Sequence, residues 1–424
     1  MPDLVAILSE ANRRRLLELL SAGEQSVSQL AGQFGVTRSA VSQHLGVLSN
    51  AGLVQARQEG RFRYYRLDPE GMAALREALE QFWTHELEQL AAALPSERGD
   101  HAMTAKTSVL VPLDPDETFA LLTEPERLRR WQAVTARVEL RAGGEYRWTI
   151  APGHTASGTI TELEPGKRVV FTWGWEGSED LAPGASTVTI TLEPAQGGTL
   201  VNLVHTGLTP EQAAGHLEGW NHYAERLVAA ARHGDAGSDE WVAFDSGDPL
   251  SAAEAALAVC QAVLRKLGPD DGNIQTPCAK FNLDELVDHL VSSLQFLGAA
   301  GGAPAPEVRT GSPEVRVADA AQATLEAWRK RGLDGTVNLG PSEVPAGVVI
   351  DIVLMELLVH AWDLAKATDR TITVDDALSA YVLERGRSLI TPQMRDGDNF
   401  AAELEAAPDA DSLTRLLAFT GRKA

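Results

Sequence analysis

Cysteine is scarce in this sequence, because only Cys260 and Cys278 occur among its 424 residues. Two cysteines are too few for a disulfide framework, and such usage is typical of the reducing cytosol. Long apolar runs are also missing, so no segment reaches the roughly 18 consecutive apolar residues of a membrane-spanning helix. The N-terminal stretch carries charges inside its apolar part and does not match a signal peptide. These absences predict a cytoplasmic protein without membrane contact.

Positive charge is in short supply as well, since 37 Lys and Arg are outnumbered by 59 Asp and Glu and the net charge is −22. Such an acidic chain is ill suited to broad, non-specific binding of nucleic acid. The charge is unevenly distributed, because residues 1–67 hold eight arginines against five acidic residues, which leaves +3 there and −25 in the rest. A basic end on an acidic body fits phosphate contact by one domain only.

The length of the chain exceeds what one hydrophobic core usually organises. Residues 94–106 are polar and poorly periodic, and residues 231–251 are rich in Gly, Asp and Ser, a composition that marks linkers. No internal repeat is evident. We therefore expect three domains, over residues 1–97, 104–233 and 248–424, in a multidomain α+β protein.

The first segment has the pattern of a helix-turn-helix followed by a β-hairpin. A helix is expected over Val27–Phe34 with Ser26 as its cap, and TRSAVSQHLGVLSNAG predicts a second helix with an apolar inner face. The alternating stretches LVQARQ and FRYYRL predict a hairpin wing. Polar side chains on the second helix and arginines on the wing are the kinds that contact base edges and phosphates. The candidate DNA-binding residues are Thr37, Arg38, Ser39, Ser42, Gln43, His44, Arg61 and Arg63.

These motifs resemble the ArsR/SmtB family of winged-helix repressors over residues 1 to about 95. The resemblance implies a homodimer that binds a palindromic operator in double-stranded DNA. The positions that carry paired cysteines in metal-sensing members correspond to Ser26 and Ser28, which excludes thiolate metal sensing there. The amphipathic stretch Pro69–Leu94 could pack on its own subunit, but the resemblance favours a dimer interface.

The second segment changes from a helical pattern to alternating strands, two short helices and a closing long helix. LRRWQ, GGEYRW, GTITELEPGKRVVFTW, TLVNLVHTGL and GWNHYAERL resemble the SRPBCC (START-like) superfamily, in the branch of Hsp90 ATPase activators, over residues 104–232. The resemblance implies a helix-grip α/β sandwich with a cavity for a small hydrophobic ligand. Candidate wall residues are Trp131, Trp148, Trp173, Trp175, Trp220 and Tyr223. The alternative is that these aromatic residues form the core. No acid–base pair stands out, which favours binding over catalysis.

The third segment predicts an all-α helical bundle with a candidate metal site. Asn282 caps a helix that carries His289, and Glu356 and His360 are four residues apart on one face of a later helix. Two imidazoles and a carboxylate make a three-ligand set for Zn²⁺ or a similar divalent metal. The four-residue spacing of Glu356 and His360 would by itself also fit a solvated Glu–His pair that binds no metal.

The motifs NIQTPCAKFNLDELVDHL, ELLVHAWDLAKAT and DADSLTRLLAFTGR resemble the DinB-like, mycothiol-dependent maleylpyruvate isomerase family of actinobacteria over residues 250–422. The resemblance implies His289, Glu356 and His360 as metal ligands and mycothiol as a thiol cofactor. Asp363 either supports a ligand or pairs along the helix, and Cys278 is interpreted as structural rather than nucleophilic.

Two functions of different classes follow from these segments. The first is an ArsR-type repressor whose DNA binding responds to a small hydrophobic or thiol-linked effector. The second is a metal- and mycothiol-dependent transferase or isomerase with an autoregulatory DNA-binding domain. A chaperone-associated adaptor, based on the second segment alone, leaves the DNA-reading surface unexplained.

Overall fold

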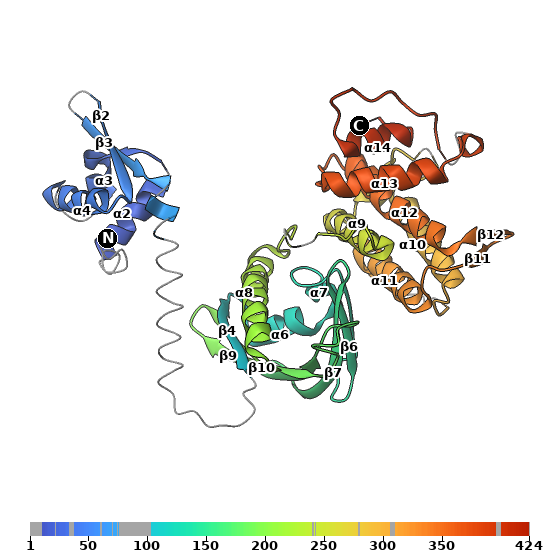
Figure 1. The fold of residues 1–424 in the computed structure, drawn as a ribbon, viewed down its shortest axis with the longest axis horizontal. Helices are drawn as coiled ribbons and strands as arrows, with labels where there is room; N and C mark the ends of the chain where they lie inside the picture. The colour runs from blue at the N-terminus through green and yellow to red at the C-terminus, as the bar shows by residue number, and fades with distance from the viewer. Residues whose placement is uncertain are drawn as a thin grey trace. The chain divides into compact units, whose positions relative to one another are not determined.

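The computed structural model of the chain forms two compact units, Met1–Asp100 and His101–Ala424 (Figure 1). The structure describes residues 11–21, 23–33, 38–59, 62–69, 71–73, 75, 103–239, 241, 243–278, 280–305, 310–395 and 400–423. Within these ranges no helix is both long and apolar enough to cross a membrane. Most of the amphipathic stretch Pro69–Leu94, for which a dimer interface is predicted, lies outside the described residues.

The first unit contains the predicted helix-turn-helix and wing. Its elements are α2 (Ala11–Ser21), β1 (Gln25–Ser26), α3 (Val27–Gln33), α4 (Arg38–Asn50), β2 (Val54–Glu59) and β3 (Phe62–Leu67), and the sheet order is β1-β3-β2. Ser26 begins α3 as predicted, because its hydroxyl accepts from the Gln29 backbone N–H and the Gln29 side chain accepts from the Ser26 N–H. Leu30, Val41 and Leu45 are fully buried in the core of this unit.

The first part of the second unit is a curved antiparallel sheet gripped by one long helix. The strands are β4 (Met103–Val111), β5 (Thr135–Val138), β6 (Glu145–Ala151), β7 (His154–Glu164), β8 (Arg168–Trp173), β9 (Ser186–Ala195) and β10 (Gly198–Leu208), in the order β4-β10-β9-β8-β7-β6-β5. The short helices α6 (Pro115–Thr123) and α7 (Pro125–Leu128) follow β4. The hairpin predicted around Gly197 and Gly198 is present, and both glycines have positive φ, which favours glycine at this turn.

The long helix α8 (Pro210–His233) closes this part of the fold. Thr209 and Gln212 form a capping box at its start, and Gly234 ends it in the left-handed conformation. Alternate side chains of β9 and β10 are buried and pack with Trp220 and Tyr223 of α8 in one core. This is the predicted helix-grip arrangement.

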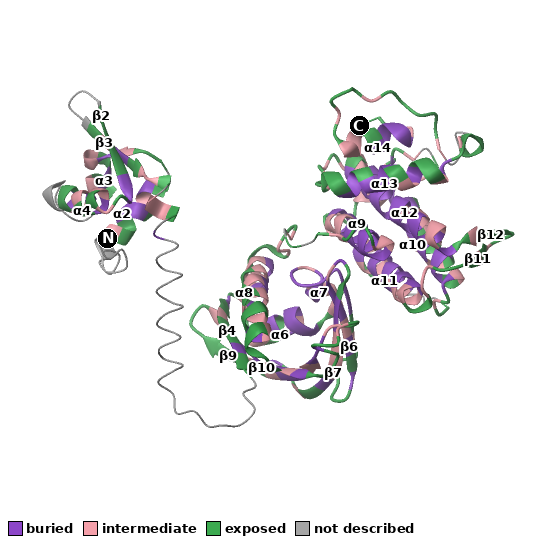
Figure 2. Ribbon diagram, viewed as in Figure 1, coloured by how far each residue is buried: buried purple, intermediate pink, exposed green. Residues whose placement is uncertain are grey.

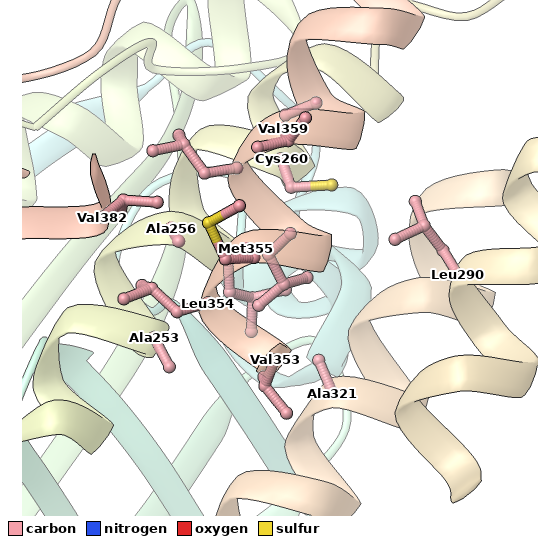
Figure 3. Packing of buried hydrophobic residues seen from close by; sticks show 14 of the residues in the cluster. Ala253, Ala256, Cys260, Leu290, Ala321, Val353, Leu354, Met355, Val359 and Val382 are labelled. Carbon is pink, nitrogen blue, oxygen red and sulfur yellow. The ribbon is translucent and has the colours of Figure 1, made fainter. Parts of the chain in front are cut away.

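The rest of the second unit is the predicted helical bundle (Figure 1). Its helices are α9 (Pro249–Leu264), α10 (Leu283–Ala300), α11 (Pro313–Arg331), α12 (Ala346–Ala367), α13 (Asp376–Leu389) and α14 (Ser412–Phe419), with a small hairpin of β11 (Thr336–Leu339) and β12 (Ser342–Pro345) that the sequence pattern did not predict. In α12, 16 of 22 residues are buried, as expected for a helix that is apolar on all sides (Figure 2). Ala253 and Ala256 of α9 have small side chains where they meet α12 (Figure 3), which allows the two helices to pack closely.

The sheet and the bundle contact each other within the second unit. Val134 belongs to the bundle's hydrophobic cluster, and the Gln261 amide of α9 donates to the Val134 carbonyl at 3.0 Å. Part of the predicted linker at residues 231–251 is also held, because Arg226 donates to the carbonyls of Gly237 and Ser238. The domain boundary expected between residues 233 and 248 stays a prediction, while both cores lie in one compact unit.

Candidate functional site

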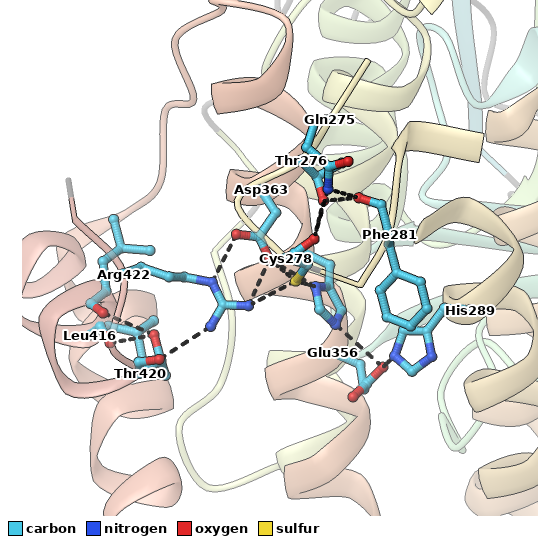
Figure 4. A network of polar contacts seen from close by, with 12 residues as sticks. Gln275, Thr276, Cys278, Phe281, His289, Glu356, Asp363, Leu416, Thr420 and Arg422 are labelled. Carbon is cyan, nitrogen blue, oxygen red and sulfur yellow. Dashed lines mark hydrogen bonds and ion pairs between the residues drawn. The ribbon is translucent and has the colours of Figure 1, made fainter. Parts of the chain in front are cut away.

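The structure brings the three predicted metal ligands together. His289 lies on α10, and Glu356 and His360 lie one turn apart on α12. Glu356 Oε2 is 3.2 Å from His289 Nε2 and 3.8 Å from His360 Nε2 (Figure 4). One ligand atom from each of the three residues lies within 4.8 Å of the other two. Helices α10 and α12 therefore bring two imidazoles and one carboxylate together at one point.

A second layer of polar contacts orients His360. Its Nδ1 lies 2.9 Å from Oδ2 of the fully buried Asp363. Arg422, which follows α14, donates to both oxygens of Asp363, at 2.8 and 2.7 Å. These contacts occupy Nδ1 of His360 and leave Nε2 directed toward Glu356. Asp363, for which the sequence left two interpretations, is thus the partner of a candidate ligand.

Charge and burial act together on these groups. Burial opposes ionisation of Asp363, but the hydrogen bonds from His360 and Arg422 outweigh it and hold the pKa of this carboxyl far below its ordinary value. Burial also disfavours the charged form of His360, yet Asp363, Cys278 and Glu356 together raise the pKa of its imidazole to about 10. For Glu356, burial is outweighed by His289 and His360, and its pKa is lowered. The centre therefore attracts positive charge, and a cation would compete with the His360 proton.

Cys278 lies beside this network in the turn that precedes α10. Its Sγ is 3.3 Å from Asp363 Oδ2 and 3.8 Å from His360 Nδ1, and it accepts from Arg422 at 3.5 Å. Cys278, His360 and Asp363 form a second group of potential ligand atoms in the described part of the chain. The sequence motifs contain both Cys278 and Arg422 but assign Arg422 no role, because nothing in the linear pattern joins residues 144 positions apart.

The donor set fits a borderline divalent cation. Two imidazole nitrogens and one carboxylate oxygen are the ligand types that Zn²⁺ takes in sites with open positions. Glu356 Oε2 is buried and faces the two histidines at 3.2 and 3.8 Å, so a cation bound between the three groups would take the place of these ion pairs. The Phe281 ring stacks on His289 with centroids 4.9 Å apart and limits the freedom of that imidazole.

The candidate DNA-reading face is only partly described. Ser42 and Gln43 are exposed on α4, His44 is half-buried, and Arg63 is exposed on β3. The opposite side of α4 is buried in the core. Thr37 and Arg61 lie outside the described residues, and for Arg38 and Ser39 only the helical backbone is described.

The predicted cavity of the helix-grip fold is narrow. Trp131, Trp148, Trp220 and Tyr223 line a space of about 30 Å³, room for about one or two water molecules. Trp173 and Trp175 do not line it. Tyr146 and Trp148 pack with ring centroids 4.4 Å apart, and Trp173 and Trp220 at 5.1 Å. The aromatic side chains thus fill most of this interior themselves, and a hydrophobic ligand there stays a prediction.

A buried histidine adjoins these rings. The Trp220 indole N–H donates to Nδ1 of His205 at 3.1 Å, so this imidazole carries its proton on Nε2 and donates to Ser186 Oγ at 2.8 Å. The Ser186 hydroxyl donates in turn to the Trp173 carbonyl at 3.0 Å. Burial, with a smaller contribution from His216, lowers the pKa of His205 to about 3. The sequence pattern did not single out this residue.

Comparison with protein families finds three matches in one chain. The model for bacterial regulatory proteins of the arsR family matches residues 10–56, and that for activator of Hsp90 ATPase homolog 1-like proteins matches residues 112–232. The model for the N-terminal domain of mycothiol maleylpyruvate isomerase matches residues 252–365. The three resemblances found in the sequence motifs are confirmed.

Individual relatives each match one part of the chain. An HTH-type transcriptional regulator of Mycobacterium tuberculosis is 46% identical over 22% of this chain and 87% of its own length. An uncharacterized protein of the same species is 32% identical over 41% of this chain and 98% of its own length. Among solved structures, an activator-of-Hsp90-ATPase-like protein of Rhizobium etli is 37% identical over 34% of this chain and 91% of that chain, with a TM-score of 0.29.

Proposed function

The chain belongs to the arsR family of bacterial regulatory proteins through its N-terminal segment, and on that premise we propose that it is a ligand-responsive, DNA-binding transcriptional repressor of the cytoplasm. The observation that carries the proposal is the exposed polar face of α4 at Ser42 and Gln43, opposite a face buried in the core. Side chains of this kind hydrogen-bond to base edges and phosphates in the major groove. The locally positive charge of residues 1–67 supports the same role.

The partner is double-stranded operator DNA, bound by a homodimer at a palindromic site. Regulators with this motif place one recognition helix per subunit in successive turns of the major groove, so that two-fold symmetry in the protein matches two-fold symmetry in the operator. Titration of the full chain against its own upstream DNA, followed by fluorescence anisotropy with and without a scrambled competitor, tests the proposal. Equal affinity for the upstream and scrambled duplexes would count against it.

The metal site of the proposal is formed by His289, Glu356 and His360, with Zn²⁺ as the cation. When bound, Zn²⁺ would act as a Lewis acid that lowers the pKa of a coordinated low-molecular-weight thiol such as mycothiol. The protein's own contribution is to hold His360 in one orientation through Asp363 and Arg422. Metal analysis of the purified chain tests whether the centre is loaded.

Regulation requires an effector with different affinities for the DNA-competent and DNA-incompetent states. A thiol-linked molecule at the metal centre and a small hydrophobic molecule bound elsewhere in His101–Ala424 are the two effector classes in the proposal. The test is operator affinity measured with and without zinc and a low-molecular-weight thiol. If zinc and the thiol leave the operator affinity unchanged, the thiol-linked class of effector is excluded.

A second candidate function is metal- and mycothiol-dependent transfer or isomerisation in the bundle, with the DNA-binding unit as an autoregulatory attachment. The observation that favours it is the set of three candidate ligands, His289, Glu356 and His360, because catalytic zinc sites keep an open position whereas structural sites are usually closed by four protein ligands. A thiol-consumption assay on zinc-loaded protein, compared with His360→Ala, separates the two functions. Thiol turnover that occurs in the wild-type protein and is lost in His360→Ala favours the enzyme. Absence of turnover in the wild-type protein favours the regulator.

A further inference from the structure

A pocket of about 510 Å³ lies between the sheet and the bundle of the second unit. Its size falls in the usual range for small-molecule sites, about 300–1,000 Å³. Trp131 and Ile150 line it from the sheet side, Val259 from α9, Leu378 from α13, and Phe244 from the segment between α8 and α9. None of its lining residues belongs to the metal centre, and the volume is far larger than the 30 Å³ under α8.

The charged residues around this pocket are already paired with other protein groups. Arg129 donates to Glu314 at 2.8 and 3.1 Å, and Arg226 donates to the Trp131 carbonyl and lies 3.3 Å from Asp239. Arg265 forms an ion pair with Asp235, and Asp375 accepts from two backbone N–H groups as the cap of α13. A charged ligand would have to disrupt one of these pairs, at the cost of leaving a charge without its partner.

Gln132 contributes an uncharged polar side chain to the pocket. The residue is 5% exposed and lines both the large pocket and the small cavity beneath α8. Its side-chain amide makes no hydrogen bond to any residue that the structure describes. Because this amide opens to the pocket and has no partner among the described residues, a molecule that hydrogen-bonds to it would be held in one orientation. The pocket thus combines apolar side chains with an uncharged, buried amide that can both donate and accept.

We propose that this pocket binds an uncharged, mainly apolar organic molecule with a single hydrogen-bonding edge, such as a carbonyl, hydroxyl or amine, that meets the Gln132 amide. The apolar walls supply most of the affinity and the amide supplies orientation. The site is independent of the DNA-binding role, because it rests on contacts within His101–Ala424 alone.

The test uses the full chain and N-phenyl-1-naphthylamine, a neutral aromatic amine whose fluorescence rises in apolar surroundings. We expect saturable binding of one probe per chain. Ala262→Trp, which fills the large pocket, should weaken binding about tenfold or more, and Ala258→Phe serves as a second filling variant if the first unfolds. Val109→Trp, which fills only the small cavity, is the matched control and should leave the affinity within about twofold.

Gln132→Leu keeps the volume of the side chain and removes the amide, and we expect it to weaken probe binding about threefold to tenfold. Thermal unfolding of each variant checks that the fold is retained. The proposal is overturned if the wild-type chain shows no saturable binding, or if Val109→Trp abolishes binding while the two filling variants at Ala262 and Ala258 do not. Unchanged affinity in Gln132→Leu would overturn the role assigned to the amide.

Discussion

Arg129 and Glu314 form a buried ion pair across 185 residues of sequence, with Nε–Oε1 at 2.8 Å and Nη2–Oε2 at 3.1 Å. Their side chains are 1% and 2% exposed. Arg129 directly follows α7 in the sheet part of the second unit, and Glu314 lies in the first turn of α11 in the bundle. The bidentate pair therefore joins two hydrophobic cores that the sequence pattern assigns to separate domains.

Loss of one member of this pair should destabilise the second unit. Glu314→Gln removes the bidentate partner of the buried Arg129 guanidinium and leaves Asp319, 4.0 Å away, as the remaining countercharge, and breaking a buried pair in this way costs about 3 kcal/mol. Urea unfolding followed by tryptophan fluorescence measures the change. Glu164→Gln is the control, because Glu164 pairs with Lys167 at an exposed position and should cost about 1 kcal/mol or less. A similar loss of unfolding free energy in both variants would show that burial of the ion pair does not determine its contribution to stability.

The contribution of His205 to the stability of the second unit should fall as the solution is acidified below the ordinary pKa of histidine, whereas His360, with its pKa raised to about 10, changes the stability in the opposite direction. The pKa of His205 is lowered to about 3 in the folded state, so the unfolded chain takes up this proton first and the contribution of His205 to stability declines between about pH 6.5 and 3. The decline from pH 7.5 to 5 amounts to roughly 2 kcal/mol for this residue. Urea titrations at several pH values measure it.

His205→Gln supplies the comparison for this pH dependence. The variant has no imidazole to protonate, so its unfolding free energy should decline less steeply over the same pH interval than that of the wild type. Identical slopes in the two proteins would show that His205 does not contribute to the acid sensitivity.

Operator binding should depend on the polar face of α4. Replacing Gln43 and His44 with alanine should reduce specific affinity by about 1–3 kcal/mol for each hydrogen bond to a base that the substitution removes. Fluorescence anisotropy against the upstream DNA measures the change. Gln196→Ala, an exposed glutamine in the turn between β9 and β10, is the matched control and should have no effect. If both proteins bind the operator equally, this helix does not read it.

Metal retention should depend on the three converging side chains. We expect His289→Ala to lose the metal while operator affinity stays largely unchanged, because the ligands and the DNA-reading helix belong to different compact units. Elemental analysis after dialysis measures metal per chain. His233→Ala removes an exposed histidine at the end of α8 and should retain the metal. Stoichiometric metal in the His289 variant would refute the ligand assignment.

Arg422 should act on the same centre as a positioning residue. Arg422→Met removes the donors that hold Asp363, so His360 loses its fixed orientation and metal affinity should drop about 10- to 100-fold. Competition with a chromophoric chelator gives the affinity. Arg415→Met, at an exposed position on α14, is the control. Equal affinity in the two variants would restrict Arg422 to a structural role.

Local patterns in the sequence were sufficient for the class of each segment. Helical periodicity and the Ser26 cap identify the helix-turn-helix, and alternation around Gly197 identifies the sheet hairpin, because these signals act between neighbouring residues. The i, i+4 spacing also places Glu356 and His360 on one helix face. The inclusion of His289 in the ligand set was suggested by ligand chemistry on two predicted helices and was supported by a family resemblance.

The tertiary structure alone decided which distant groups meet. Arg422 reaches Asp363 across 59 residues, and Arg129 reaches Glu314 across 185, and no local periodicity encodes such contacts. It also decided where space remains, since the tryptophans predicted to wall a cavity largely fill it, while the larger pocket lies between the two cores. Sequence determined the elements because helix and strand patterns are short-range, whereas ion pairs and cavities depend on how whole elements pack.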